Sequence, residues 1–99
     1  MLLRIGTVIR SFKSKALAAF FLGNVPVGLR PLESQLSRRL QILDSAMSPK
    51  SLAGLRSNHF EALKGDRKGQ YSIRVNMQWR LCFRFEREDA YDVELVDYH

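Results

Sequence analysis

The chain has 99 residues, a net charge of +6 and one cysteine. This length suits a single domain with one hydrophobic core, and we predict one domain over residues 1–99. The lone Cys82 excludes an internal disulfide and a cysteine zinc cluster, and its strand position suggests a packed or half-exposed thiol. No apolar run reaches the ~20 residues of a transmembrane helix, and the stretch from Met1 to Val8 has no signal-peptide pattern. We therefore expect a cytoplasmic protein without a membrane partner.

The positive charge lies mainly in the first part of the chain. Residues 1–59 contain nine Lys or Arg against two acids, a surplus of seven, whereas residues 60–99 contain seven against eight, a balance of minus one. A polyanion or an acidic protein is the natural partner of such a surface. Many small basic proteins have no such partner, so charge alone leaves nucleic acid open.

The chain begins with a predicted strand and a predicted helix. Val8–Phe12 is short and β-branched at its start, which favours a strand. Ser14 can cap a helix over residues 15–22, and Gly23-Asn24 is a suitable stop. This strand and helix form the N-terminal part of the fold.

A second, longer helix is predicted after a loop over residues 24–30. Pro31 suits its first position, and Ser48-Pro49 is expected to end it. Apolar residues recur along it at three- and four-residue steps: Leu32, Leu36, Leu40, Leu43 and Met47. This stripe is expected to face a sheet, and a short helical turn is possible within residues 50–58.

The second half of the chain predicts a sheet. Strands are expected around residues 59–64, 70–76, 79–86 and 90–96. Asn76-Met77-Gln78 is a short link between the second and third of these, which predicts an antiparallel hairpin. In the third strand Trp79, Leu81, Phe83 and Phe85 fall on one side, and Arg80, Cys82, Arg84 and Glu86 on the other. The predicted fold class is α+β, with an N-terminal strand and two helices packed on an antiparallel sheet.

Several kinds of active site can be set aside. His59 and His99 are far apart, and neither has a carboxylate at a metal-ligand spacing. Ser57 and Ser72 lack the setting of a serine nucleophile, and the glycines of residues 65–69 frame a turn instead of a nucleotide-binding loop. We expect neither a metal nor a cofactor.

The remaining polar residues suit RNA cleavage through its own 2′-hydroxyl. That reaction needs a base, cations for the phosphorane charge, and an acid for the leaving oxygen. Candidates lie at predicted strand ends and in the 64–69 turn: Lys64, Arg67, Lys68, Arg80, Asp97, Tyr98 and His99. His59 and Glu61, two apart on one predicted strand, would share a face. Many basic sheets with a carboxylate and a histidine would fit the same description.

Five stretches carry a resemblance to a known family. They are residues 9–12 (IRSF), 39–46 (RLQILDSA), 63–69 (LKGDRKG), 75–81 (VNMQWRL) and 96–99 (VDYH). From about Val8 to His99 the chain resembles the HigB toxins, within the RelE/ParE group of toxin–antitoxin systems. The resemblance implies a ribosome-dependent endoribonuclease that cuts mRNA on the 70S ribosome. It also implies neutralisation by a HigA-type helix-turn-helix antitoxin, and contact with operator DNA only through the antitoxin complex.

The resemblance also assigns residue roles. Arg80 would hold the scissile phosphate through its planar fork, with Lys64 adding a point charge. Tyr98 would stack on a base or orient the sugar. His99 is the candidate for proton transfer, because its ordinary pKa lies near neutral pH, and Asp97 would orient it or act as the base. Arg38 and Arg39, with the turn cations, would contact RNA, although an exposed helix face explains these two arginines almost as well.

The chain departs from the family pattern at two places. Several members have a histidine three residues before the lysine, where this chain has Glu61. Glu61 could serve as the base, or His59 could supply the imidazole, or the nuclease could be weaker. Residues 1–7 precede the usual start and stay unassigned. A different class of function therefore stays open, either a ParE-like gyrase inhibitor or a degenerate toxin that acts as an antitoxin-bound corepressor.

Overall fold

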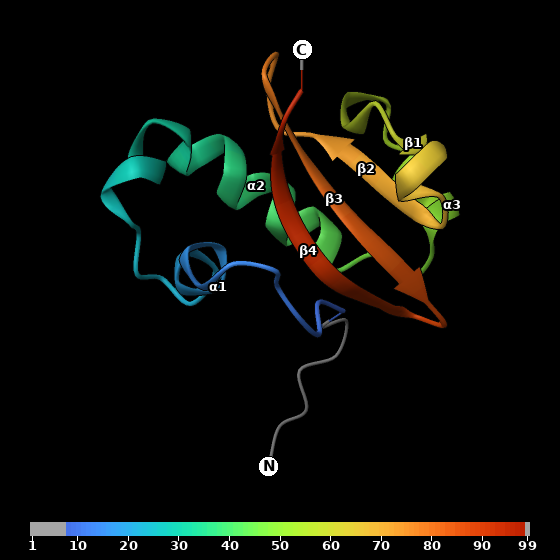
Figure 1. Ribbon diagram of the computed structural model, residues 1–99, viewed down its shortest axis with the longest axis horizontal. Coiled ribbons are helices and arrows are strands. Elements are labelled where there is room, and N and C mark those ends of the chain that lie inside the picture. The colour runs from blue at the N-terminus through green and yellow to red at the C-terminus, as the bar shows by residue number, and fades with distance from the viewer. Residues whose placement is uncertain (1–7, 99) are drawn as a thin grey trace.

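The computed structural model describes residues 8–98, and its architecture is α+β (Figure 1). The described residues form one antiparallel sheet in the order β1-β2-β3-β4. The strands are β1 (Glu61–Ala62), β2 (Gln70–Arg74), β3 (Trp79–Glu86) and β4 (Asp89–Asp97). The helices are α1 (Lys15–Phe21), α2 (Glu33–Asp44) and α3 (Pro49–Ala53), with 3-10 turns η1 (Val27–Leu32), η2 (Arg56–Asn58) and η3 (Gly65–Arg67). The predicted fold class and the β2–β3 hairpin are confirmed.

The first described residues run parallel to β4. Ile9 and Phe12 form isolated bridges with Ala90 and Val93, so the predicted strand over Val8–Phe12 pairs with the sheet without becoming a continuous strand. The Asp44 carboxylate, at the end of α2, accepts hydrogen bonds at 2.9 Å from the backbone N–H groups of Val8 and Ile9. This joins the segment to the helix as well as to the sheet. Residues 1–7 lie outside the described part of the chain.

The first predicted helix is confirmed, but the second has different ends. Ser14 Oγ accepts from the Leu17 N–H at 3.0 Å, the expected N-cap bond of α1. Pro31 belongs to the η1 turn, and α2 starts only at Glu33. Ser48-Pro49 starts α3 instead of ending α2, because Ser48 and Ser51 form a reciprocal capping box and proline suits the first turn.

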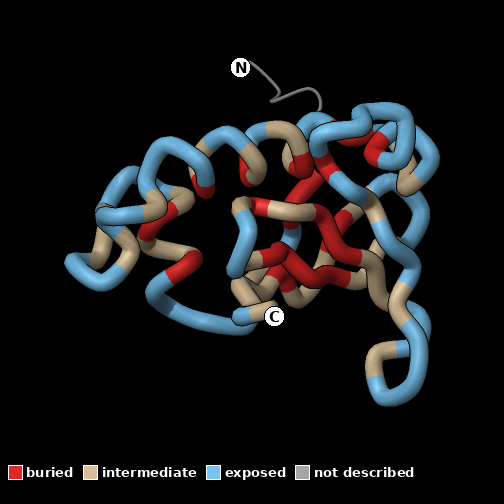
Figure 2. Tube along the Cα trace, turned by 90° about the horizontal axis from the view of Figure 1, so that it is seen from above, coloured by how far each residue is buried: buried red, intermediate tan, exposed pale blue. Residues whose placement is uncertain are grey.

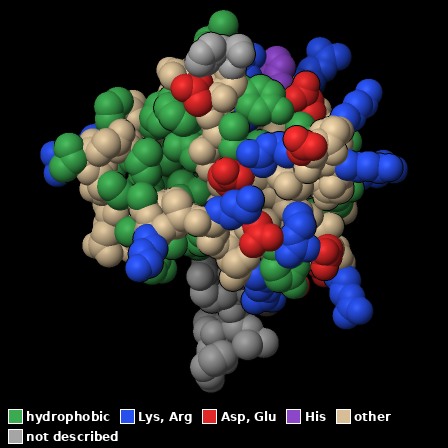
Figure 3. Space-filling view, in the orientation of Figure 1, with side chains coloured by type: hydrophobic (Ala, Val, Ile, Leu, Met, Phe, Trp, Pro, Cys, Tyr) green, Lys and Arg blue, Asp and Glu red, His purple; other side chains and the backbone are tan. Residues whose placement is uncertain are grey.

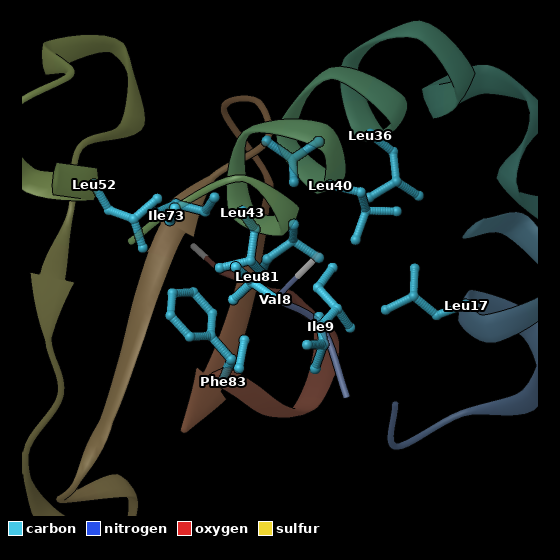
Figure 4. Packing of buried hydrophobic residues seen from close by; sticks show 14 of the residues in the cluster. Val8, Ile9, Leu17, Leu36, Leu40, Leu43, Leu52, Ile73, Leu81 and Phe83 are labelled. Atoms are coloured by element: carbon cyan, nitrogen blue, oxygen red, sulfur yellow. The ribbon is translucent and has the colours of Figure 1, made fainter. Parts of the chain in front are cut away.

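The core lies between α2 and one face of the sheet. In Figure 4, Leu36, Leu40 and Leu43 of α2 point toward the strands. Their sheet partners include Ile73, Leu81 and Phe83, and every one of these six side chains is less than 2% exposed. Figure 2 shows the buried positions at the centre of the fold, surrounded by exposed segments. Met47, predicted as part of the apolar stripe, is 67% exposed because α2 ends three residues earlier.

The central strand β3 is covered on both faces. Leu81 and Phe83 face the helices, whereas Arg80 and Cys82 point to the other side of the pleat. We expected that second side to be polar, yet Arg80 is 8% exposed and Cys82 is fully buried. One extra residue in β4 shifts the register between Cys82 and Arg84, and Asp92 there has a left-handed φ of 55°. The predicted alternation of faces along β3 is therefore confirmed, and so is the packed setting expected for the Cys82 thiol, but Arg80 is not at a solvent-exposed position.

Cys82 is expected to react slowly with a thiol reagent such as DTNB in the native protein. Burial raises the pKa of its thiol, so little of the reactive thiolate exists near neutral pH. Modification should be at least about tenfold slower than in the same protein unfolded in urea. Equal rates in the two states would contradict the burial of this side chain.

No helix within residues 8–98 is long and apolar enough to cross a membrane.

Candidate active site

The second face of the sheet carries a buried arginine at its centre. Arg80 Nε donates to Ser72 Oγ at 2.8 Å, and Arg80 Nη2 donates to the backbone carbonyl of His59. Ser72 is fully buried on the neighbouring strand β2. In the register of the sheet, Ser72 pairs with Glu61 on one side and with Cys82 on the other, so these side chains share the face of Arg80. The guanidinium is fixed by acceptors of two residues, Ser72 and His59, and the Ser72 carbonyl also accepts from Nη2 at 3.4 Å.

Two further groups flank the Arg80 guanidinium. Glu61 Oε1 lies 3.7 Å from Arg80 Nη2, and the glutamate side chain is 55% exposed. The ring of Tyr98 lies over the guanidinium, 5.5 Å from its carbon to the ring centroid. Arg80 Nη1 makes no hydrogen bond within residues 8–98. A cation, a carboxylate and an aromatic ring thus meet at one place, with one nitrogen of the cation available to an anion.

The hairpin between β2 and β3 holds the C-terminal residues in place. Asn76 Oδ1 accepts from the N–H groups of Gln78 and Trp79 and shapes the turn. The Gln78 carbonyl accepts from the Tyr98 N–H at 2.6 Å, and Gln78 Nε2 donates to Asp97 Oδ2 at 3.1 Å. The position of Tyr98 over the sheet therefore depends on this turn.

The predicted catalytic residues do not all meet at Arg80. Glu61 and Tyr98 do, but Asp97 pairs with Trp79 in the register, one position beyond the partner of Arg80, and so points to the other face of the sheet. Lys64 is exposed at the residue that precedes η3. His99 lies outside the described residues. Sequence reasoning missed Ser72, whose signal was its place on the polar side of the predicted β2 strand.

The turn cations differ in their surroundings. Arg67 Nη1 donates to Gln70 Oε1 at 3.0 Å and to Glu94 Oε1 at 3.1 Å. The hydrogen bond with Glu94 raises the pKa of Arg67. Lys68, by contrast, is exposed. Figure 3 shows charged side chains gathered over the strands and hydrophobic side chains on the side of α1.

Arg38 and Arg39 of α2 are also in different settings. Arg38 is exposed, whereas Arg39 Nη1 donates to Oδ1 of the buried Asn58 at 2.8 Å. Burial lowers the pKa of Arg39, and the charge of Arg38 lowers it further. Arg39 therefore fixes the η2 turn as well as adding positive charge.

His59 does not share a strand with Glu61. It ends η2 with a left-handed φ of 43°, outside β1, so the predicted alternation of the two residues is wrong. Its Nε2 lies 3.3 Å from Arg74 Nη1, while its backbone carbonyl contacts Arg80. Among residues 8–98, no group of three His, Cys, Asp or Glu side chains could hold a metal ion.

Comparison with known families accounts for nearly the whole chain. The sequence model of the RelE-like toxin of the type II toxin–antitoxin system HigB matches residues 10–99. The chain belongs to this family of HigB-type toxins. The family assignment confirms the resemblance seen in the sequence motifs.

Two curated relatives agree with this assignment. The HigB-type chain is 37% identical over 93 residues to Endoribonuclease HigB of Proteus vulgaris. The aligned region covers 93% of this chain and 100% of that protein. It is also 42% identical over 76 residues to Toxin HigB-1 of Vibrio cholerae serotype O1, covering 75% and 80%.

Solved structures of other toxins have the same fold as this HigB-type chain. The YoeB–YefM complex from Staphylococcus aureus matches with a TM-score of 0.55 at 20% identity, over 92% of this chain and 97% of that one. The YoeB dimer from Staphylococcus aureus matches with a TM-score of 0.55 at 18% identity, over 95% and 98%. At these identities the likeness shows the fold alone.

Replacing Ser72 by Ala in the HigB-type toxin is expected to lower the free energy of unfolding by about 1–3 kcal/mol. The change removes the acceptor of Arg80 Nε at a site that water does not reach. Urea unfolding measures the effect, with Ser34→Ala on the exposed side of α2 as the matched control. A Ser72 variant as stable as this control would show that Arg80 does not depend on the hydroxyl.

Proposed function

We propose that this HigB-type toxin is an endoribonuclease that cuts mRNA on the ribosome without a metal ion. The observation that carries the proposal is the buried Arg80, fixed by Ser72 and the His59 carbonyl, with Glu61 and Tyr98 beside it. The name of the Proteus vulgaris relative, Endoribonuclease HigB, supports the same activity. A preorganised cation is most useful in a reaction where negative charge develops, as on the phosphorane of RNA cleavage.

The proposed reaction uses the 2′-hydroxyl of the RNA as nucleophile. Its oxygen bonds to the neighbouring phosphorus as the P–O5′ bond breaks, which leaves a 2′,3′-cyclic phosphate and a 5′-hydroxyl. Arg80 stabilises the extra charge on the phosphate oxygens, with Lys64 adding a second cation. Glu61 accepts the proton of the 2′-hydroxyl, and Tyr98 stacks on a base.

The leaving O5′ needs a proton donor. His99 is our candidate from the family resemblance, and Asp97 is proposed to orient it. Arg38, Arg39, Arg67 and Lys68 are proposed to contact RNA, with Arg38 and Lys68 as the more exposed pair. The ion pair of Arg67 with Glu94 reduces the positive charge that it offers to a phosphate.

We further propose that a HigA-type antitoxin neutralises the toxin in the cytoplasm, and that operator DNA is bound only through that complex. Family membership supports an antitoxin partner. A complex of toxin with antitoxin, YoeB–YefM, is also among the solved structures that share the fold.

Primer extension on mRNA from cells that briefly express the toxin tests the nuclease. Wild-type protein should produce cuts within translated codons, and Arg80→Ala and a chain that lacks His99 should produce none. The same cuts by purified, EDTA-treated toxin on programmed ribosomes should persist in 1,10-phenanthroline, which removes transition metals while the Mg²⁺ that the ribosome itself needs is kept. Growth arrest without cuts would refute the proposal and favour a gyrase inhibitor, whereas neither arrest nor cuts would favour a degenerate toxin.

A further inference from the structure

A second basic feature lies next to Arg80. A hollow of about 330 Å³ opens between α2, the η2 turn and the β2–β3 hairpin. Its polar lining consists of Gln35, Arg39, Ser57, His59, Arg74 and Asn76, and it includes no aspartate or glutamate. Two arginines, a histidine and neutral hydrogen-bonding groups thus surround one space.

The two arginines of the hollow have no carboxylate partner among residues 8–98. Arg67 and Arg84 differ from them, because each has a guanidinium nitrogen within 4.0 Å of a carboxylate oxygen. Arg74 is held by the Asn76 carbonyl, which accepts from its Nε at 3.1 Å, and Arg39 by Asn58. Both are oriented by neutral acceptors, which leave their positive charges uncompensated. Two cations that face one space repel each other, and a bound anion would relieve that repulsion.

The orientation of His59 adds a donor to the hollow. A guanidinium can only donate hydrogen bonds, so His59 Nε2, 3.3 Å from Arg74 Nη1, must be the acceptor. A neutral imidazole in this arrangement carries its proton on Nδ1. In that tautomer Arg74 and His59 support each other without an acid, and the one N–H of His59, on Nδ1, is left for another partner.

The hollow is adjacent to the Arg80 site. Arg74 and Arg80 are directly paired residues of β2 and β3, so their backbones lie about 5 Å apart. His59 belongs to both places, because its side chain lines the hollow while its carbonyl holds Arg80. An RNA strand that places one phosphate on Arg80 can place a neighbouring phosphate in the hollow.

We propose that the hollow of Arg39, His59 and Arg74 binds a backbone phosphate of RNA beside the phosphate held by Arg80. Arginine forks and an imidazole N–H are suitable phosphate donors, and phosphate contacts position a nucleic acid without reading its sequence. The inference rests on the proposed nuclease function for the identity of the anion. It gives a physical reason for the absence of acids from this lining.

The test measures binding to RNA that cannot be cut. The probes are a short single-stranded RNA with 2′-O-methyl groups throughout, and ribosomes with an mRNA that is 2′-deoxy in the open codon. The main variant is Arg74→Gln with His59→Asn, because asparagine tolerates the left-handed backbone at position 59. Arg39 is left unchanged, since it holds the η2 turn. The control is Arg30→Gln, which removes one exposed cation of η1.

The double variant should bind the RNA about tenfold more weakly, and the slope of log K against log salt concentration should fall by about 0.7, the value for one phosphate of a single strand. The control should stay within about twofold of wild type. His59→Asn alone keeps the hydrogen bond between Arg74 and Asn76 and should bind the RNA about threefold more weakly than wild type. This single variant replaces the double variant in the test if the double variant does not fold.

Equal affinities and slopes for the double variant and wild type would overturn the inference, as would a wild-type protein that binds RNA neither free nor on the ribosome. Ribosomes without mRNA identify the source of the phosphate. If the double variant binds these empty ribosomes more weakly than wild type, the phosphate belongs to ribosomal RNA. If it binds more weakly only when mRNA is present, the phosphate belongs to the mRNA. Wild-type protein that binds RNA with the predicted slope but cuts none would refute the nuclease alone.

Discussion

Arg80→Lys is expected to lower the rate of RNA cleavage on programmed ribosomes by roughly 10²-fold or more, although the substitution keeps the positive charge. The guanidinium is held through Nε by Ser72 and through Nη2 by the His59 carbonyl, and Nη2 also lies 3.7 Å from Glu61 Oε1. An ammonium group carries its three N–H donors on a single nitrogen, which cannot occupy the separate positions of Nε and Nη2 and also present a planar fork to a phosphate. The rate of cleavage at saturating toxin measures the effect.

The same strand offers a matched control. Arg84 also lies in β3, contacts Asp92 at 2.9 Å, and has its guanidinium 5.2 Å from the ring centroid of Tyr91. These contacts lie toward the end of β3 that is remote from Tyr98, so Arg84→Lys should leave cleavage within about twofold of wild type. If Arg80→Lys cleaved RNA as fast as this control, the planar fork would have no part in the reaction.

Leu40→Ala is expected to lower the free energy of unfolding by about 2–5 kcal/mol. The side chain is 1% exposed at the centre of α2 and packs in the cluster between the helix and the sheet. Its removal loses buried apolar surface and leaves a cavity that close packing cannot fully refill. Because a domain of this size has roughly 5–15 kcal/mol of total stability, this loss is large. Urea unfolding followed by circular dichroism measures it.

Met47→Ala is the matched comparison, because periodicity alone placed Met47 on the same apolar stripe. Its side chain is 67% exposed, so we expect a change of no more than about 0.5 kcal/mol. A loss at Met47 as large as that at Leu40 would mean that α2 continues beyond Asp44. The pair therefore tests where the helix ends as well as where the core lies.

The arrangement of Arg80 shows how a buried cation can be built into a sheet. Taking a charge out of water is costly, and the cost is offset only if its donors find good acceptors. Ser72 and the His59 carbonyl supply two of them from protein segments on either side of β1. Among residues 8–98, no buried side-chain nitrogen or oxygen lacks a hydrogen-bond partner. The hydrogen bonds that make burial of Arg80 tolerable are therefore the same ones that fix its orientation in the site.

Local patterns in the sequence determined much of the fold. The Ser14 cap, the short Asn76-Met77-Gln78 link and the leucines of α2 act over a few residues, so their effects could be predicted without the rest of the chain. The motif around Lys64 and Arg80 led to the right family, which the family comparison confirms. The roles of these residues in catalysis stay a prediction.

Only the tertiary structure decided which faces are covered and which side chains meet. Cys82 and Arg80 are buried on a face that period-two alternation predicts to be polar, and at Arg80 the ring of Tyr98, Ser72 of β2 and the His59 carbonyl surround the guanidinium. The pairing register points the Asp97 side chain to the face opposite Arg80, and the left-handed His59 lies outside β1, where its backbone carbonyl is what contacts Arg80. Alternation is a property of the local backbone, whereas coverage depends on segments far apart in the chain. The hollow of Arg39, His59 and Arg74 has the same origin, since α2, η2 and β2 meet only in the folded protein.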